Sequence, residues 1–381
     1  MSIQKNIKKV ASHIKSQVRE RDEVIDGIFT AMLSGHHVVQ LGSPGEAKSL
    51  IARLICESLK GQSGQGNEYF EWLLTRFSVP EEIFGSLSLK SLESNDQYIR
   101  KTENKLPAAK ISFLDEIFKA NSGILNSLLT VLNEGLYHNG DKGAMKTDLL
   151  CCIAASNEYP EKDCAALWDR FLVRFWIEEI KGEDSFLDII DPNTQGATPL
   201  AGVVSVEDIK KARAEVSAVA FPRDTLSVMS EIKAEMKKLG VRVSTRRWKQ
   251  ATKYVQAKAY YDGDSEVTSD TFMCLADVLW SEHKERPAIR KALLKVCNPV
   301  MVEATEYFDA MTELLSESSK RDDEDVISYG VRCGGIHEEM LKVRDRLSRL
   351  GESKKLDAMV EKANGMLESV KKQALQAAGI V

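Results

Sequence analysis

Residues 42 to 49 have the sequence Gly-Ser-Pro-Gly-Glu-Ala-Lys-Ser and lie between an apolar run at residues 38 to 41 and a helical pattern that begins at Leu50. A strand, a glycine-containing loop and a helix in this order are typical of a phosphate-binding loop. Backbone N–H groups in such a loop point at an anion, and the helix start adds partial positive charge. The Lys48 ammonium can reach the β and γ phosphates, and the Ser49 hydroxyl can bind Mg²⁺. The segment predicts a nucleoside triphosphate site formed by Gly42, Ser43, Pro44, Gly45, Glu46, Ala47, Lys48, Ser49 and Leu50.

The loop departs from the common pattern G-x-x-x-x-G-K-[ST] at one position, because Ala47 stands where the last glycine is expected. Alanine adds only one methyl group, so a phosphate can still approach the backbone if residue 47 does not need a positive φ angle. The structural alternative is an ordinary Gly/Pro turn between a strand and a helix. The motifs that follow along the chain decide between these two interpretations.

A second apolar run, residues 111 to 114, ends in Asp115 and Glu116. Phosphoryl transfer needs a positioned nucleophile and neutralised phosphate charge. We therefore expect Asp115, with Ser49, to hold Mg²⁺ and Glu116 to polarise the attacking water. Such a strand end is weak evidence alone, but behind a phosphate loop it indicates a Walker B motif.

A third apolar run, residues 149 to 155, comes shortly before Asn157. Ligands of open α/β sheets bind at the carboxyl ends of the strands, so the Asn157 amide can orient the lytic water or touch the γ phosphate. An ordinary turn before Pro160 is the alternative. The next apolar segment contains Arg170 and Arg174, and arginines in apolar surroundings need an anionic partner.

The order of these motifs resembles the MoxR group of AAA+ ATPases, and within it the RavA branch, regulatory ATPase variant A. The resemblance covers about the first three quarters of the chain. In that branch, too, an alanine precedes the lysine of the phosphate loop. The segments that carry the resemblance are residues 42–49, 74–85, 113–117, 154–158 and 244–249.

The resemblance implies an α/β fold with an αβα P-loop core around a parallel sheet, a helical lid and a C-terminal helical bundle. No strand-rich stretch is visible in the C-terminal region, where the RavA branch carries a small β-rich domain. Helical patterns there predict three helices, at residues 288–316, 326–350 and 354–378. The expected domains are residues 1–181 for the core, 182–285 for the lid and 286–381 for the bundle.

Residue roles also follow from the resemblance. Asn157 corresponds to sensor 1, and Arg170 to the arginine finger that reaches a neighbouring subunit's site. Arg174 is then a second anion contact, or the finger itself, or a structural ion-pair partner. Arg246 corresponds to sensor 2, although the adjacent Arg247 is an equal candidate.

Three further segments resemble parts of the family. Residues 84–107 are similar to an insert within helix 2, and an Asn-Gly turn signal within residues 134–143 predicts a hairpin before the third strand. Such hairpins face the central pore in related rings, and ordinary surface loops are the alternative. The pair Glu20-Arg21 is similar to a segment that helps to enclose the adenine.

Composition restricts the partners. The net charge of −5 and the pI of about 5.9 disfavour nucleic acid. Seven cysteines without a C-x-x-C pair indicate reduced thiols. No segment approaches the roughly 20 consecutive apolar residues of a membrane span. We expect a cytoplasmic protein that is not inserted in a membrane.

These observations predict an Mg²⁺-dependent ATPase that binds ATP and works as a homo-oligomeric ring, a hexamer in the simplest case, to remodel a protein client. The client cannot be identified from the sequence, and the resemblance suggests a partner with a von Willebrand A domain. One alternative is a nucleotide-dependent scaffold or signalling ring with little turnover. Another is a DNA-directed motor or bacterial defence component, which would need a basic pore lining from Lys90, Arg100, Lys101, Lys142 and Lys146.

Overall fold

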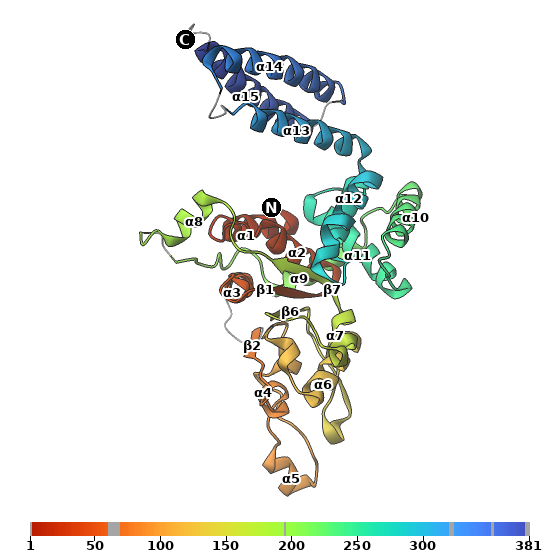
Figure 1. Ribbon diagram of the computed structural model, residues 1–381. Helices are drawn as coiled ribbons and strands as arrows, with labels where there is room; N and C mark the ends of the chain where they lie inside the picture. The colour runs from red at the N-terminus through yellow and green to blue at the C-terminus, as the bar shows by residue number, and fades with distance from the viewer. Residues whose placement is uncertain (1, 60–68, 194–195, 320–323, 352–353, 378–381) are drawn as a thin grey trace. The chain divides into compact units, whose positions relative to one another are not determined.

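The computed structural model describes residues 2–59, 69–193, 196–319, 324–351 and 354–377. The chain forms two compact units, residues 1–289 and residues 290–381 (Figure 1). We call them unit 1 and unit 2 and describe each by itself.

Unit 1 is built on a five-stranded sheet in the order β2-β3-β6-β1-β7, and every neighbouring pair is parallel. All residues of β1 and β6 are buried, in keeping with the near-continuous apolar runs that a covered parallel sheet requires. The parallel pairing brings the carboxyl ends of β1, β3 and β6 to one edge of the sheet. The strands are β1 His37–Gly42, β2 Tyr69–Leu73, β3 Ile111–Asp115, β6 Cys151–Ser156 and β7 Phe171–Ile177.

The helices of unit 1 include an N-terminal pair. The first helix buries Ile7, Val10, Ala11 and Ile14 along one stripe with helical spacing. In the region of the predicted lid, α9 and α11 both pack against α2. The helices are α1 Ile3–Lys15, α2 Asp22–Ser34, α3 Lys48–Ser58, α6 Ser122–Glu134, α7 Ala165–Arg170, α8 Glu183–Ile190, α9 Val206–Val216, α10 Arg223–Lys238 and α11 Thr245–Asp262.

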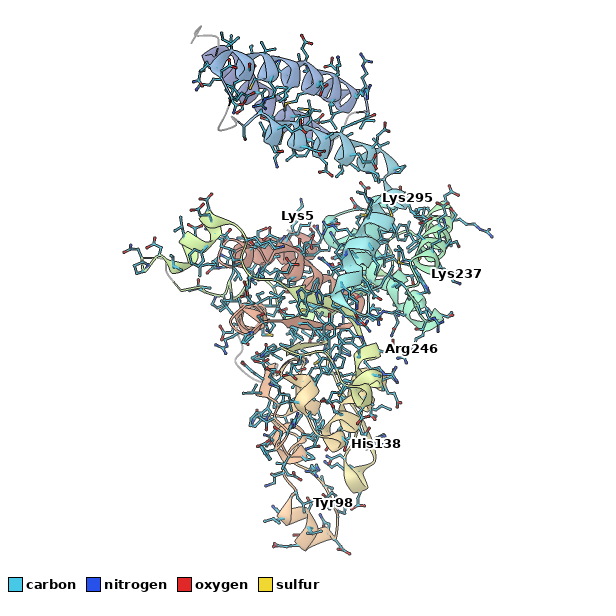
Figure 2. All side chains as sticks on the ribbon, in the orientation of Figure 1. Lys5, Tyr98, His138, Lys237, Arg246 and Lys295 are labelled. Carbon is cyan, nitrogen blue, oxygen red and sulfur yellow. The ribbon has the colours of Figure 1, made fainter. Side chains whose placement is uncertain are left out.

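The hairpin predicted within residues 134–143 is present: β4 Leu136–His138 pairs antiparallel with β5 Ala144–Lys146. Its Asn-Gly signal belongs to a longer loop, in which the buried Asn139 side chain bonds both the N–H and the carbonyl of Arg100. Arg100 lies in the other insert, residues 84–107, which begins at the end of α4 Pro80–Phe84 and contains α5 Leu89–Asn95. The two inserts are therefore joined by hydrogen bonds. Figure 2 labels Tyr98 from the first insert and His138 from the hairpin.

The prediction of one helix over residues 288–316 was wrong. The segment contains two helices, α12 Arg286–Cys297 and α13 Pro299–Glu317. Proline lacks an N–H and fits the first turn of a helix, and the Asn298 side chain caps the new helix by accepting the Met301 N–H at 3.1 Å.

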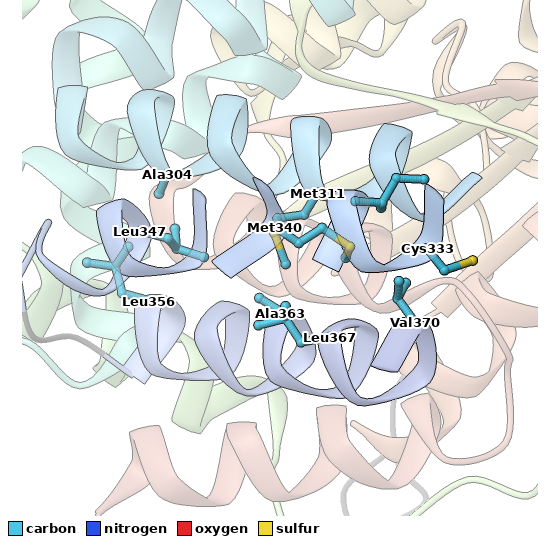
Figure 3. Close-up of a cluster of buried hydrophobic side chains, with 10 residues drawn as sticks. Ala304, Met311, Cys333, Met340, Leu347, Leu356, Ala363, Leu367 and Val370 are labelled. Atoms are coloured by element: carbon cyan, nitrogen blue, oxygen red, sulfur yellow. The ribbon is translucent and has the colours of Figure 1, made fainter. Parts of the chain in front are cut away.

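Unit 2 contains a bundle of three helices: α13, α14 Val326–Ser348 and α15 Lys354–Ala377. The last two agree with the prediction, except that Ala378 lies outside the described residues. The core of the bundle, drawn in Figure 3, consists of Ala304, Met311, Cys333, Ile336, Met340, Leu347, Leu356, Ala363, Leu367 and Val370.

In the part of the chain that the structure describes, no helix has the length and apolar character needed to cross a membrane. None of the seven cysteines forms a disulfide in the structure, which agrees with the reduced thiols expected from the sequence.

Candidate nucleotide site

The loop between β1 and α3 has the geometry of an anion-binding turn. Gly42 has a φ of 150°, and a Cβ there would lie 2.3 Å from the Ile177 carbonyl oxygen, so only glycine fits. No side chain caps the start of α3. The first N–H groups of a helix without such a cap are suited to bind a phosphate.

Ala47 adopts a left-handed conformation, with φ 62° and ψ 16°. The sequence argument allowed alanine here on the condition that the position does not need positive φ, and the structure does not meet that condition. A non-glycine residue in this region costs roughly 1–2 kcal/mol. The loop holds this strain at the position that directly precedes Lys48, as strained residues at binding sites often do.

Asn157 bridges the phosphate-loop lysine and the Walker B glutamate. The Lys48 ammonium donates to the Asn157 amide oxygen at 2.8 Å, and the Asn157 amide nitrogen donates to the Glu116 carboxylate at 2.5 Å. Lys48 also donates to the carbonyls of Gly42 and Ser43, at 2.6 and 2.7 Å. Burial lowers the pKa of Lys48, although nearby carboxylates, Asp115 first among them, act in the opposite direction.

Ser49 and Asp115 lie together, as a magnesium site requires. The Ser49 hydroxyl donates to Asp115 Oδ2 at 3.3 Å, while Asp115 Oδ1 accepts the Glu116 N–H at 2.9 Å. Among the described residues no cluster of three or more His, Cys, Asp or Glu side chains could hold a metal by itself. One carboxylate and one hydroxyl fit Mg²⁺, which is usually bound by one or two carboxylates together with substrate phosphates.

Arg21 and Glu46 form a contact that the sequence did not predict. The Arg21 guanidinium, 5% exposed, donates to the Glu46 carboxylate at 2.7 Å and to the Glu178 carbonyl at 2.9 Å. Beside it, the Glu20 carboxylate accepts the N–H groups of Lys181 and Gly182. The chain before α2 and the chain after β7 are thus both fastened to the phosphate loop.

Arg174 is engaged by the protein itself. It donates to the carbonyls of Phe171, Trp168 and Trp280, and its guanidinium lies 4.0 Å from the centroid of the Trp168 ring. Burial lowers the pKa of Arg174 well below its usual range. These contacts favour a structural role over a phosphate contact.

Arg247 and Arg246 have different surroundings. Arg247 is buried and donates to the carbonyls of Phe171, Leu172 and Val278, and burial lowers its pKa to about 10. It therefore joins α11 to the start of β7. Arg246 is exposed and contacts the Asn133 amide oxygen on α6.

Arg170 is the last residue of α7 and is half-buried. Its Nε is buried without a hydrogen-bond partner, and among the described residues no hydrogen bond or ion pair engages its guanidinium. Arg170 differs in this respect from Arg174 and Arg247, whose guanidinium groups donate to backbone carbonyls.

The sheet register separates Arg170, Arg246 and Arg247 from the phosphate loop. At one edge of the sheet Gly42 pairs with Ile177, and at the other His37 pairs with Phe171, the residue after Arg170. The six residue steps along β7 correspond to about 20 Å, which is longer than any side chain. Arg247 contacts Phe171 at this far edge, as described above. Arg246 lies near it too, because Asn133 follows Leu132, whose carbonyl accepts from the His37 ring.

The parallel sheet, the loop after β1 and the acidic pair after β3 define a P-loop ATPase of the AAA+ class. A model of the MoxR domain in the MoxR-vWA-beta-propeller ternary systems matches residues 5–197, and a model of the AAA lid domain matches residues 224–293. The chain belongs to the MoxR family of AAA+ ATPases.

Several known proteins are similar to this chain. Two uncharacterised proteins of Methanocaldococcus jannaschii are 33% and 31% identical, over 96% and 90% of this chain and 98% and 90% of their own lengths. A structural protein of Acidianus two-tailed virus is 26% identical over 47% of this chain and 30% of its own. A solved structure of a candidate ATPase from Cytophaga hutchinsonii, 16% identical, has a TM-score of 0.60 over 77% of this chain and 94% of that one, which shows a shared fold.

Replacing Arg247 by Met should lower the free energy of unfolding of unit 1 by about 3 kcal/mol, because three buried carbonyls lose their donor. Arg246→Met is the matched control and should change it by less than about 0.5 kcal/mol, as exposed substitutions usually do. Urea unfolding followed by tryptophan fluorescence measures this, since all five tryptophans lie in unit 1. Equal stability of the two variants would contradict the structural assignment of Arg247.

Proposed function

We propose that this chain hydrolyses ATP with Mg²⁺ as a ring of identical subunits, a hexamer in the simplest case, and uses the energy to remodel a protein partner. The observation that carries the proposal is the distance between the ATP-binding groups and Arg170 within one subunit. The groups suited to bind and activate ATP lie at one edge of the sheet, whereas Arg170, which no described residue engages, ends α7 at the other edge.

Within one subunit, different residues bind the phosphates, orient the attacking water and hold Mg²⁺. The Lys48 ammonium and the N–H groups at the start of α3 bind phosphate oxygens, and Glu116 orients the attacking water. Asn157 holds the Glu116 carboxylate through its amide nitrogen. Ser49 and Asp115 would hold Mg²⁺, which when bound neutralises phosphate charge.

A neighbouring subunit supplies the remaining positive charge in this proposal. Arg170 acts as the arginine finger in trans, and Arg246, at the same edge of the sheet, is the sensor 2 candidate, since Arg247 is engaged by carbonyls. Stabilisation of the transition-state charge by an arginine finger is among the largest single terms in such reactions.

The partner and the setting are part of the proposal. The matched family model takes its name from systems that combine MoxR with vWA and beta-propeller proteins, which supports a partner with a von Willebrand A domain. A chaperone-like action, the RavA branch and a cytoplasmic location remain predictions from the sequence. The DNA-motor alternative loses support because Arg100, one of its basic residues, pairs with Glu81 at 2.8 Å.

The first test concerns the nucleotide site. Lys48→Ala should abolish ATP binding because the β and γ phosphates lose their charged partner. Glu116→Gln should bind ATP like the wild type and fail to hydrolyse it. Calorimetry and phosphate release measure the two steps. Wild-type ATP affinity in Lys48→Ala would contradict the phosphate-loop assignment. Undiminished turnover in Glu116→Gln would contradict the role of Glu116, and turnover as low in the wild type as in Glu116→Gln would favour the scaffold alternative.

A second test concerns completion of the site by a neighbour. Arg170→Ala subunits keep the nucleotide site but lack the finger, whereas Lys48→Ala subunits keep the finger but bind no nucleotide. A mixture should recover activity, because a Lys48→Ala subunit can complete the site of an Arg170→Ala neighbour. Since losing such a finger typically costs ~10³-fold or more in rate, the recovered activity should stand well above both parents.

The control for this mixture is Arg174→Ala in place of Arg170→Ala. Arg174 is engaged within its own subunit, so its loss should not be complemented by Lys48→Ala subunits. A mixture with Arg170→Ala that co-assembles and yet stays inactive would contradict the finger role of Arg170.

A further inference from the structure

The short helix α8 carries an exposed apolar surface. Four of its eight residues are large and apolar, and between 52% and 55% of each is exposed: Phe186, Leu187, Ile189 and Ile190. No residue of α8 is buried. Helices this short are marginal in water, and contiguous exposed apolar surface usually marks an interaction site. The helix therefore needs a covering surface.

The position of α8 links it to the phosphate loop. Asp188 pairs with Arg19 at 2.8 Å, and Lys181 and Gly182, just before the helix, donate to Glu20. The next residue after Glu20 is Arg21, which holds Glu46 of the loop. The residues at the start of α8 are therefore connected through Glu20 and Arg21 to the phosphate loop.

A groove of complementary character lies between α10 and α11. It is a cavity of about 690 Å³, lined by Ser230, Lys233, Ala234, Met236, Lys237, Gly240, Val241, Arg242, Val243 and Trp248. Val241, Val243 and Trp248 give it apolar surface. Of these lining residues, three are basic and none is acidic, whereas α8 begins with the acidic residues Glu183 and Asp184. The groove therefore complements α8 both in charge and in apolar character.

The helix and the groove cannot meet within one chain. Figure 1 shows α8 and α10 on opposite sides of unit 1, and Figure 2 labels both Lys237 and Arg246 on the side of α10. Complementary surfaces on opposite sides of a subunit join copies head to tail, and such contacts close into a ring when the rotation allows.

We propose that α8 of one subunit docks in the α10–α11 groove of the next subunit, so the occupant of the groove is a second copy of this chain. The proposal rests on the ring described above. Trp248, which lines the groove, is two residues from Arg246, while α8 is fastened beside the phosphate loop. Docking thus brings the Arg246 side of one subunit to the nucleotide site of its neighbour.

The test uses the full chain with the Glu116→Gln substitution, saturated with ATP and Mg²⁺, and measures assembly by sedimentation velocity. The double substitution Leu187→Ser with Ile190→Ser should raise the protein concentration needed for half-assembly at least tenfold. Leu89→Ser on α5 removes an apolar side chain that is 65% exposed and should leave that concentration unchanged. Circular dichroism checks that each variant is folded.

Charge reversal identifies the partner surface. Lys233→Glu with Lys237→Glu should weaken assembly at least tenfold, as should Glu183→Lys with Asp184→Lys. All four substitutions in one chain should restore assembly to within about threefold of the parent, because the opposite charges face each other again.

The outcomes separate the two proposals. If the parent protein does not assemble, the ring fails and this inference fails with it. If the parent assembles and the α8 and groove variants assemble equally well, the ring stands and the docking inference is overturned. Assembly that is unchanged while a von Willebrand A partner no longer binds would assign α8 to that partner and also overturn the inference.

Discussion

The nucleotide site depends on the parallel pairing of β3, β6 and β1. Phe113 pairs with Ile153, and Ile153 pairs with Val38, so the three strands end at the same edge. This alignment allows Asn157, which follows β6, to contact Lys48 after β1 and Glu116 after β3. A register shift between these strands would separate the three side chains, which are far apart in the sequence.

The same sheet also places Arg170, the proposed arginine finger, away from the nucleotide site of its own subunit. Arg170 precedes β7, so it lies at the amino end of that strand, about 20 Å from the loop at the carboxyl end. Arg247 occupies this end as a structural residue that joins α11 to β7. In the proposed ring the Arg170 guanidinium, which no described residue of its own subunit engages, contributes to the site of a neighbour. Activity and assembly then depend on each other.

Much of the fold and site could be predicted because the motifs are local. Residues 42–49 and the acidic pair after residue 114 each combine strand, loop and chemistry within a few positions, and their order along the chain indicates a doubly wound sheet. The break between α12 and α13 at Asn298-Pro299 also has a local signal, because a cap residue precedes a proline there. The apolar periodicity on both sides of the break obscured this signal.

Other features depend on contacts that no local pattern encodes. The sequence did not predict that Ala47 is left-handed, because its φ is set by the turn that joins β1 to α3. Arg246 and Arg247 are adjacent and chemically identical, and only the packing of α11 against β7 decides which one is buried. The pair of Arg21 and Glu46 spans 25 positions, so it could not be recognised without the fold.

The central claim is that a neighbouring subunit completes the nucleotide site. The most direct measurement is the ATPase rate per subunit of the unmodified chain as a function of its concentration, with the mass of the species followed by light scattering. The rate per subunit should rise with concentration and level off where the oligomer is fully formed. A rate that does not change with concentration in a species that remains monomeric would contradict the claim.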